Sequence, residues 1–153
     1  CKILIDAAQS IPHFKVDVSS FDCDFLVFSG HKIFAPTGVG ILYVKEDRFP
    51  EMKPYQGGGD MIKEVSFEKT TYNTHPHKFE AGTPNIAGVI GLNEALKYVN
   101  KIGIDKIAII ENELLKYALE KISEIDKLKI FGNAKDKASK INALIFTQHF
   151  KRN

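Results

Sequence analysis

Two short apolar runs of this sequence end in polar side chains whose types could do chemistry together. A carboxylate and an amide follow the first run in "ILIDAAQ", and hydroxyl, imidazole and amine groups follow the second in "DFLVFSGHK". The side chains are Asp6, Gln9, Ser29, His31 and Lys32. In an open α/β sheet, ligands bind beyond the carboxyl ends of the strands. If both runs are strands of one such sheet, these groups could face a single crevice.

This combination of groups suits the cofactor pyridoxal 5'-phosphate. A lysine amine can form an imine with the aldehyde of that cofactor, and a carboxylate can keep its pyridine nitrogen protonated. Small hydroxyl and imidazole donors can hold the phosphate. Simpler interpretations stay open at this point: Asp6 could cap the turn that follows it, and Lys32 could be a solvated loop lysine. Many unrelated chains would match the pattern by chance.

Strands and turns must position these groups, and the first third of the chain provides both. Its apolar runs, Lys2 to Ile5, Phe25 to Phe28 and Gly40 to Val44, predict buried strands. Between the last two runs, the glycines of "APTGVG" predict a loop. From Phe49 to Pro84 no hydrophobic period is sustained, which predicts long loops with a short strand or two.

A helical period begins at Ile86, and the apolar residues that follow it recur at a spacing that places them on one helix face. They are Val89, Leu92, Leu96 and Val99. Gly103 separates this helix from a second one, whose apolar stripe we interpret as core packing. The stripe consists of Ile104, Ile107, Ala108, Leu114, Leu115, Ala118, Leu119, Ile122 and Ile125. After Asp126, "KLKIFG" and "INALIFTQ" predict two strands of a smaller layer.

The composition is that of a soluble globular protein. The 153 residues are 44% hydrophobic and 26% charged, with a net charge of +2 that does not indicate nucleic acid or an anionic membrane as a partner. No apolar run approaches the roughly 20 residues that span a bilayer. Two cysteines and no visible targeting segment favour the cytoplasm. Because "CKILIDAAQ" and "INALIFTQHFKRN" place both ends within predicted strands, we expect a piece of a larger protein.

Three other features have simple interpretations. His75 and His77 form an H-x-H pair that could bind metal, but no convincing third ligand lies nearby in the sequence, so we predict loop histidines and no metal site. The triple glycine Gly57 to Gly59 lacks the lysine and hydroxyl of a P-loop, and we interpret it as a flexible loop at a dimer active site. Cys23 precedes an apolar run and is predicted to be a buried small hydrophobe.

Four stretches of the chain resemble one known family. "DAAQ", "DCDFLVFSGHKIFAPTGVGILYVK", "QGGGDMI" and "FEAGTPNIAGVIGL", in this order, are similar to the cysteine desulfurase and selenocysteine lyase branch of the class V aminotransferases. The similarity is strongest to the Suf-type desulfurases. It covers nearly the whole chain and is most specific over Asp22 to Val44 and Phe79 to Pro84.

The resemblance implies a fold and a division of the chain. The fold would be α/β, as part of a fold type I pyridoxal-phosphate-dependent transferase. Residues 1–90 would belong to the cofactor-binding large domain, which has a mostly parallel sheet. Residues 91–153 would form a linking helix and the start of a smaller α+β C-terminal domain.

The resemblance also implies a role for each candidate residue. Lys32 would form the Schiff base with the cofactor, Asp6 would pair with the pyridine nitrogen, and Gln9 would hydrogen-bond the phenolic oxygen. Ser29 and His31 would hold the phosphate.

Thr83, in "EAGTPN", matches a threonine that reaches the phosphate of the neighbouring subunit's cofactor. The resemblance therefore implies a homodimer in which each active site needs two chains. Lys78 stands where the family has an arginine before "FEAGTP", so the contacts of that guanidinium would be weakened.

The implied reaction removes sulfur from L-cysteine and leaves L-alanine. Lys32 would remove the α-proton, and an enzyme cysteine would take the sulfur as a persulfide and pass it to an acceptor protein for iron–sulfur cluster assembly. Neither Cys1 nor Cys23 matches that cysteine, and in the family it lies, with the substrate-binding arginine, beyond the position of Asn153. We therefore expect an inactive fragment of a desulfurase. The alternatives are another enzyme of the class V aminotransferase family and a non-catalytic fragment.

Overall fold

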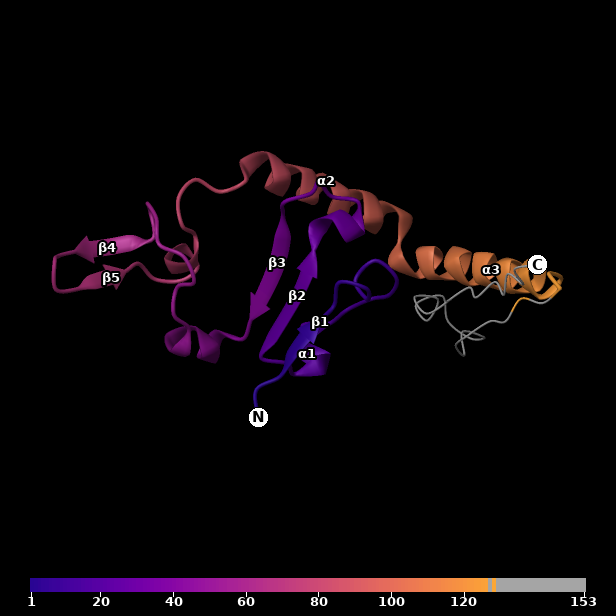
Figure 1. Cartoon of the computed structure of the whole chain (residues 1–153), viewed down its shortest axis with the longest axis horizontal. Helices are drawn as coiled ribbons and strands as arrows, with labels where there is room; N and C mark the ends of the chain where they lie inside the picture. Colours follow the sequence, from indigo (N-terminus) through magenta and orange to yellow (C-terminus); the bar gives the residue numbers. More distant parts are fainter. Residues whose placement is uncertain (127, 129–153) are drawn as a thin grey trace, which may run out of the picture.

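A three-stranded sheet in the first third of the chain carries most of the candidate residues. The computed structural model describes residues 1–126 and 128. Strands β1 (Leu4–Asp6), β2 (Phe25–Ser29) and β3 (Gly40–Val44) form the sheet in the order β1-β2-β3 (Figure 1). Their β-branched and aromatic side chains favour an extended backbone. Strand β2 lies at the centre, with one neighbour on each side.

The register of this sheet brings the polar ends of two strands to one edge. Strands β1 and β2 are parallel, and Asp6 lies opposite Val27. Strands β2 and β3 are antiparallel, and Ser29 lies opposite Gly40. Opposite residues project from the same face of a sheet, and so do residues two apart along a strand. Asp6 and Ser29 therefore share one face of the sheet, at its edge.

The predicted strand positions are confirmed to within two residues, but the predicted burial is wrong for the outer strands. Leu4 in β1 is 60% exposed and Leu42 in β3 is 52% exposed, whereas Leu26 in β2 is only 2% exposed. The register places Leu4 and Leu42 on the face of the sheet opposite to that of Leu26, and the difference in exposure is a difference between these two faces. The predicted α/β class is confirmed. The described sheet itself has one parallel and one antiparallel pair.

The middle of the chain contains a β-hairpin, which agrees with the predicted long loops and short strands. Strands β4 (Ile62–Val65) and β5 (Thr70–Tyr72) pair in antiparallel fashion and lie apart from the three-stranded sheet (Figure 1). The 3-10 helices η2 (Glu46–Glu51) and η3 (His77–Phe79) lie before and after the hairpin. One further short helix, α1 (Val18–Phe21), precedes β2.

Both predicted helices are present. Helix α2 (Ile86–Ile102) runs across one end of the sheet, and α3 (Ile104–Ser123) extends away from it (Figure 1). Gly103 joins them with a φ of 91°, a backbone conformation that favours glycine.

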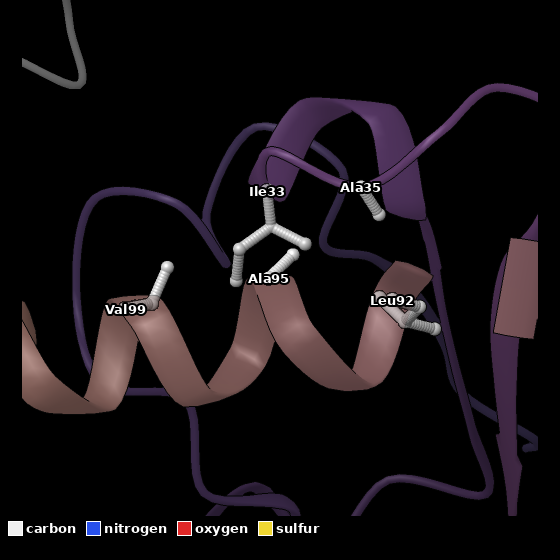
Figure 2. Close-up of a cluster of buried hydrophobic side chains, with 5 residues drawn as sticks. All are labelled: Ile33, Ala35, Leu92, Ala95 and Val99. Atoms are coloured by element: carbon white, nitrogen blue, oxygen red, sulfur yellow. The ribbon is translucent and has the colours of Figure 1, made fainter. Parts of the chain in front are cut away.

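Helix α2 packs one face against the segment that follows β2. Figure 2 shows that its buried side chains and those of this segment form one cluster. The members are Ile33, Ala35, Leu92, Ala95 and Val99. Leu96 packs at the margin of the cluster, as predicted. Val89 is exposed, because the buried face of α2 consists of Gly88, Leu92, Ala95 and Val99 and Val89 lies beside that face.

The interpretation of the α3 stripe as core packing is wrong at two of its nine positions, whereas the other seven are buried or partly buried. Ile104 and Ile107 border the α2 cluster and Leu115 is buried, but Leu114 and Ile125 are exposed. Beyond its first turns α3 leaves the sheet behind (Figure 1), so no described element covers these positions. The two strands predicted after Asp126 lie outside the described residues. Within residues 1–126 and 128, no helix combines the length and apolar character needed to cross a membrane.

Candidate active site at the edge of the three-stranded sheet

An open hollow of about 420 Å³ lies at the sheet edge where β1 and β2 end. We call it the sheet-edge hollow; it is lined by Asp6, Ala8, Val27, Phe28, Ser29, Gly38, Val39 and Gly40. Gly40 leaves little space for a side chain, since a Cβ atom there would lie 3.0 Å from the carbonyl oxygen of Phe28. The strand register therefore produces one concave surface with a carboxylate and a hydroxyl on it.

Asp6 caps a turn and also lines the sheet-edge hollow. Its Oδ1 atom accepts a hydrogen bond of 2.9 Å from the backbone N–H of Ala8, which caps the turn after β1. The exposed side chain also lines the sheet-edge hollow. Because a carboxylate has several acceptor positions, the cap leaves Asp6 able to bind a positively charged or N–H group in the hollow.

Ser29 and His31 form a polar pair beside the hollow. The Oγ atom of Ser29 and the Nδ1 atom of His31 are 2.8 Å apart, within hydrogen-bond distance. The turn between them depends on Gly30, whose N–H donates to the carbonyl of Val39 at 2.8 Å. A Cβ atom on Gly30 would lie 2.9 Å from that same oxygen. A hydroxyl and an imidazole held together in this way are suitable ligands for an anion.

Lys32 lies in the 3-10 helix η1 (Gly30–Ile33), directly after β2. Its side chain is partly buried, and within the described part of the chain it has no ion-pair partner. The next residue, Ile33, belongs to the core cluster with α2 (Figure 2). Phe34 ends the turn with a φ of 67°. Helix α2 therefore anchors the turn from which the lysine amine projects.

Gln9 and Thr83 are not among the residues that line the sheet-edge hollow. Gln9 is exposed in the turn after β1. Thr83 is exposed between Gly82 and Pro84, which line a second hollow of about 440 Å³. We call it the hairpin hollow; its other residues are Asp60, Asn73, His77 and Glu80. The structure thus brings together Asp6, Ser29 and His31, with Lys32 next in the chain.

The triple glycine packs against the segment that carries Thr83. A Cβ atom on Gly58 would lie 3.0 Å from backbone atoms of Ala81 and Gly82. The N–H of Gly82 also donates to the carbonyl of Gly59 at 3.0 Å. A side chain at Gly58 would force these two segments slightly apart.

Asn85 was not identified from the sequence as a functional residue. Its Oδ1 atom accepts a hydrogen bond of 2.9 Å from the N–H of Gly88, which caps α2. Its Nδ2 atom donates a hydrogen bond of 3.0 Å to the carbonyl of Gly38, at the rim of the sheet-edge hollow. An asparagine just before an apolar helical period is a capping signal. The contact with Gly38 leaves no such signal.

A charged network fixes the other end of the sheet. Asp24 is nearly buried, and its carboxylate accepts hydrogen bonds of 2.7 Å from the backbone N–H of Ile3 and from Nε of Arg48. The hydrogen bond from Ile3 and the neighbouring Arg48 guanidinium lower the pKa of Asp24 below its ordinary value. The network ties the starts of β1 and β2 together. It therefore holds the two strands in the register that the site requires.

The remaining candidate groups have other contacts. His75 stacks on Phe49 with ring centres 4.2 Å apart, and His77 lines the hairpin hollow. Residues 1–126 and 128 contain no group of three His, Cys, Asp or Glu side chains that could hold a metal ion. Lys78 donates a hydrogen bond of 3.1 Å from Nζ to the carbonyl of Phe49. Cys23 is 1% exposed in the core, as predicted.

Comparison with known proteins matches nearly the whole chain to one family. Residues 1–152 match the family model described as aminotransferase class-V. The chain is 54% identical over 133 residues to a cysteine desulfurase of Wigglesworthia glossinidia brevipalpis, an alignment that covers 86% of this chain and 32% of that protein. It is 47% identical over 146 residues to a probable cysteine desulfurase of Xylella fastidiosa, covering 95% of this chain and 35% of the relative.

Solved structures share the fold. The cysteine desulfurase CsdA of Escherichia coli matches with a TM-score of 0.83 and 39% identity, over 88% of this chain and 34% of that one. A cysteine desulfurase of Thermococcus onnurineus matches with a TM-score of 0.80 and 36% identity, over 90% of this chain and 35% of that one. The chain thus spans about a third of the length of these proteins.

Proposed function

This chain belongs to the class V aminotransferase family, and on that basis we propose that it binds pyridoxal 5'-phosphate through Lys32 as part of a cysteine desulfurase. One observation carries the proposal. The sheet register and the α2 cluster bring Asp6, Ser29, His31 and the turn with Lys32 to one edge of the sheet. These groups match, one for one, the chemistry that the cofactor presents.

The donor set at the sheet-edge hollow fits the cofactor. Asp6 offers a carboxylate for a protonated ring nitrogen, and the pair of Ser29 and His31 offers donors for a phosphate. Lys32 offers an amine that no carboxylate neutralises within the described residues. Gln9, in the turn after β1, would bind the phenolic oxygen. When bound, pyridoxal phosphate supplies an electron-accepting ring that stabilises negative charge at the substrate α-carbon.

In this proposal, each candidate residue at or beside the sheet-edge hollow has a defined task. Lys32 would hold the cofactor covalently and, once the substrate amine has displaced it, would take the α-proton of L-cysteine at Nζ. Asp6 keeps the ring nitrogen protonated, which maintains the electron-accepting form of the ring. Ser29 and His31 hold the phosphate end, so that the reacting part of the cofactor keeps a fixed orientation.

The whole reaction extends this assignment. L-Cysteine would be converted to L-alanine, and its sulfur would pass as a persulfide to an enzyme cysteine and then to an acceptor protein for iron–sulfur cluster assembly. The names of the relatives support the desulfurase activity. Cys23 is too deeply buried to be the accepting thiol. Thr83, which is exposed and outside the sheet-edge hollow, would serve the site of a second subunit in a cytoplasmic homodimer.

The proposal is tested by incubating the purified chain with increasing concentrations of pyridoxal phosphate, removing the unbound cofactor, and recording the absorbance of the protein. We expect a long-wavelength band that borohydride abolishes, in the wild-type chain and in Lys53→Ala, which removes an exposed lysine. Lys32→Ala should show no such band. Asp6→Asn keeps an acceptor for the Ala8 N–H but loses the charge, and it should weaken binding about tenfold or more, as expected for a hydrogen bond to a charged group. A band that persists in Lys32→Ala would refute the assignment.

A further inference from the structure

The side-chain amide of Asn85 joins two parts of the structure that are far apart in sequence. Its oxygen accepts from the N–H of Gly88 at 2.9 Å, and its nitrogen donates to the carbonyl of Gly38 at 3.0 Å. Only one orientation of the amide satisfies both contacts, since an N–H must meet the oxygen and a carbonyl must meet the nitrogen. Capping α2 uses only the oxygen. The nitrogen therefore has a separate structural role.

Two glycines make room for this amide. A Cβ atom on Gly88 would lie 2.4 Å from Nδ2 of Asn85, and one on Gly38 would lie 3.3 Å from the same atom. Gly38 also has a φ of 80°, which favours glycine. The side chain thus occupies a space that the backbone on both sides leaves open. Its position is defined by close packing as well as by hydrogen bonds.

Each end of the bridge leads to a part of the candidate site. Gly38 lines the sheet-edge hollow, next to Gly40, which pairs with Ser29. On the other side, Thr83 lies two residues before Asn85, and a hydrogen bond of 2.8 Å from the N–H of Ile86 to the carbonyl of Pro84 closes the backbone around Asn85. The Nδ2 contact of Asn85 thus connects the segment that carries Thr83 to the rim of the hollow.

We propose that Asn85 is a positioning residue that fixes the segment carrying Thr83 relative to the rim of the sheet-edge hollow. This inference rests on the proposed function, in which the hollow holds the phosphate of one cofactor and Thr83 reaches the phosphate of the cofactor in a second subunit. Asn85 would then connect Thr83, which serves the site of the second subunit, to the backbone of Gly38 at the site of its own chain. Its contribution to cofactor binding comes through these two segments and not through contact with the cofactor.

Three substitutions separate the bridge from the helix cap. Asn85→Asp and Asn85→Ser keep an acceptor for the Gly88 N–H but lose the donor to Gly38, whereas Asn85→Ala loses both. We expect Asn85→Asp and Asn85→Ser to leave the unfolding midpoint of the chain near that of the wild type. Asn85→Ala should lower it. In the cofactor-free chain, Asn85→Asp and Asn85→Ser should speed amide hydrogen exchange over residues 36–40. Unchanged exchange in both would overturn the proposal.

Cofactor titration gives a second readout. Losing the exposed hydrogen bond to Gly38 should weaken pyridoxal phosphate binding about threefold to tenfold in both Asn85→Asp and Asn85→Ser. Weaker cofactor binding in Asn85→Asp but not in Asn85→Ser would indicate repulsion of the phosphate by the new charge and would contradict the proposal. If Asn85 acts through Thr83, Asn85→Ser should weaken cofactor binding less in a chain that already carries Thr83→Val than in the wild-type chain. A wild-type chain that binds no cofactor would refute the proposed function, and hydrogen exchange would still decide on Asn85.

Discussion

Replacing Leu92 with alanine should loosen the turn that carries Lys32, although Leu92 lies on α2 and lines neither hollow. The Leu92 side chain is 4% exposed and belongs to the buried cluster with Ile33 and Ala35 (Figure 2). Leucine-to-alanine substitutions in cores cost about 2–5 kcal/mol, and the smaller values apply where the surroundings can relax. This cluster is small and bordered by partly buried residues. We therefore expect a loss of about 2–3 kcal/mol in the free energy of unfolding.

Val89→Ala is the matched control on the same helix. Val89 is 52% exposed, so its truncation removes little buried surface. Alanine also favours the helix over valine by several tenths of a kcal/mol, which offsets part of that loss. We expect the free energy of unfolding to change by less than about 0.5 kcal/mol.

Urea unfolding followed by circular dichroism measures both variants, with the free energy taken by linear extrapolation to water. A pyridoxal phosphate titration under conditions where each variant is folded then reports on the Lys32 turn. We expect Leu92→Ala to bind more weakly than Val89→Ala. Equal stabilities would show that the cluster does not hold α2 on the η1 turn. Lower stability with unchanged binding would show that the cluster does not position Lys32.

Two further predictions concern the other end of the sheet and the cysteines. The folded-state pKa of Asp24 is lowered, so its stabilising contribution is complete above the ordinary aspartate pKa of about 4 and is lost as the pH falls through the lowered value. Asp24→Asn should therefore reduce the dependence of the free energy of unfolding on pH in this acid range, as measured by urea unfolding at several pH values. An unchanged dependence on pH would contradict this prediction. Cys1 is exposed and Cys23 buried, so a thiol reagent should label Cys1 rapidly and Cys23 only on unfolding; rapid labelling of both would contradict the described core.

Local sequence patterns predicted those elements whose signals lie within a few residues. Helix α2 begins at Ile86 because an asparagine cap precedes an apolar period there, and both signals are visible in the sequence. Strand β2 was predicted because its apolar run is bounded by polar residues. Asp6 was predicted to cap a turn or to face a crevice, and its position at the end of β1 allows both.

Contacts between distant segments could not be predicted in this way. Asn85 and Gly38 are 47 residues apart, and only the packing of α2 against the loop after η1 brings them together. The apolar period of α3 indicates a helix face but not which element covers it, and among the described residues positions such as Leu114 stay exposed. Thr83 was found through family resemblance, since neither its burial nor a local pattern distinguishes it.

The central claim is that Lys32 is the residue that binds pyridoxal phosphate, and peptide mapping after borohydride reduction tests it most directly. The chain is incubated with the cofactor, reduced, digested and analysed by mass spectrometry. Our account predicts that the mass of the reduced cofactor is found on the peptide containing Lys32. In Lys32→Ala, no one peptide should be labelled in preference to the others. Labelling spread over exposed lysines such as Lys53, and equal in the wild type and Lys32→Ala, would contradict it.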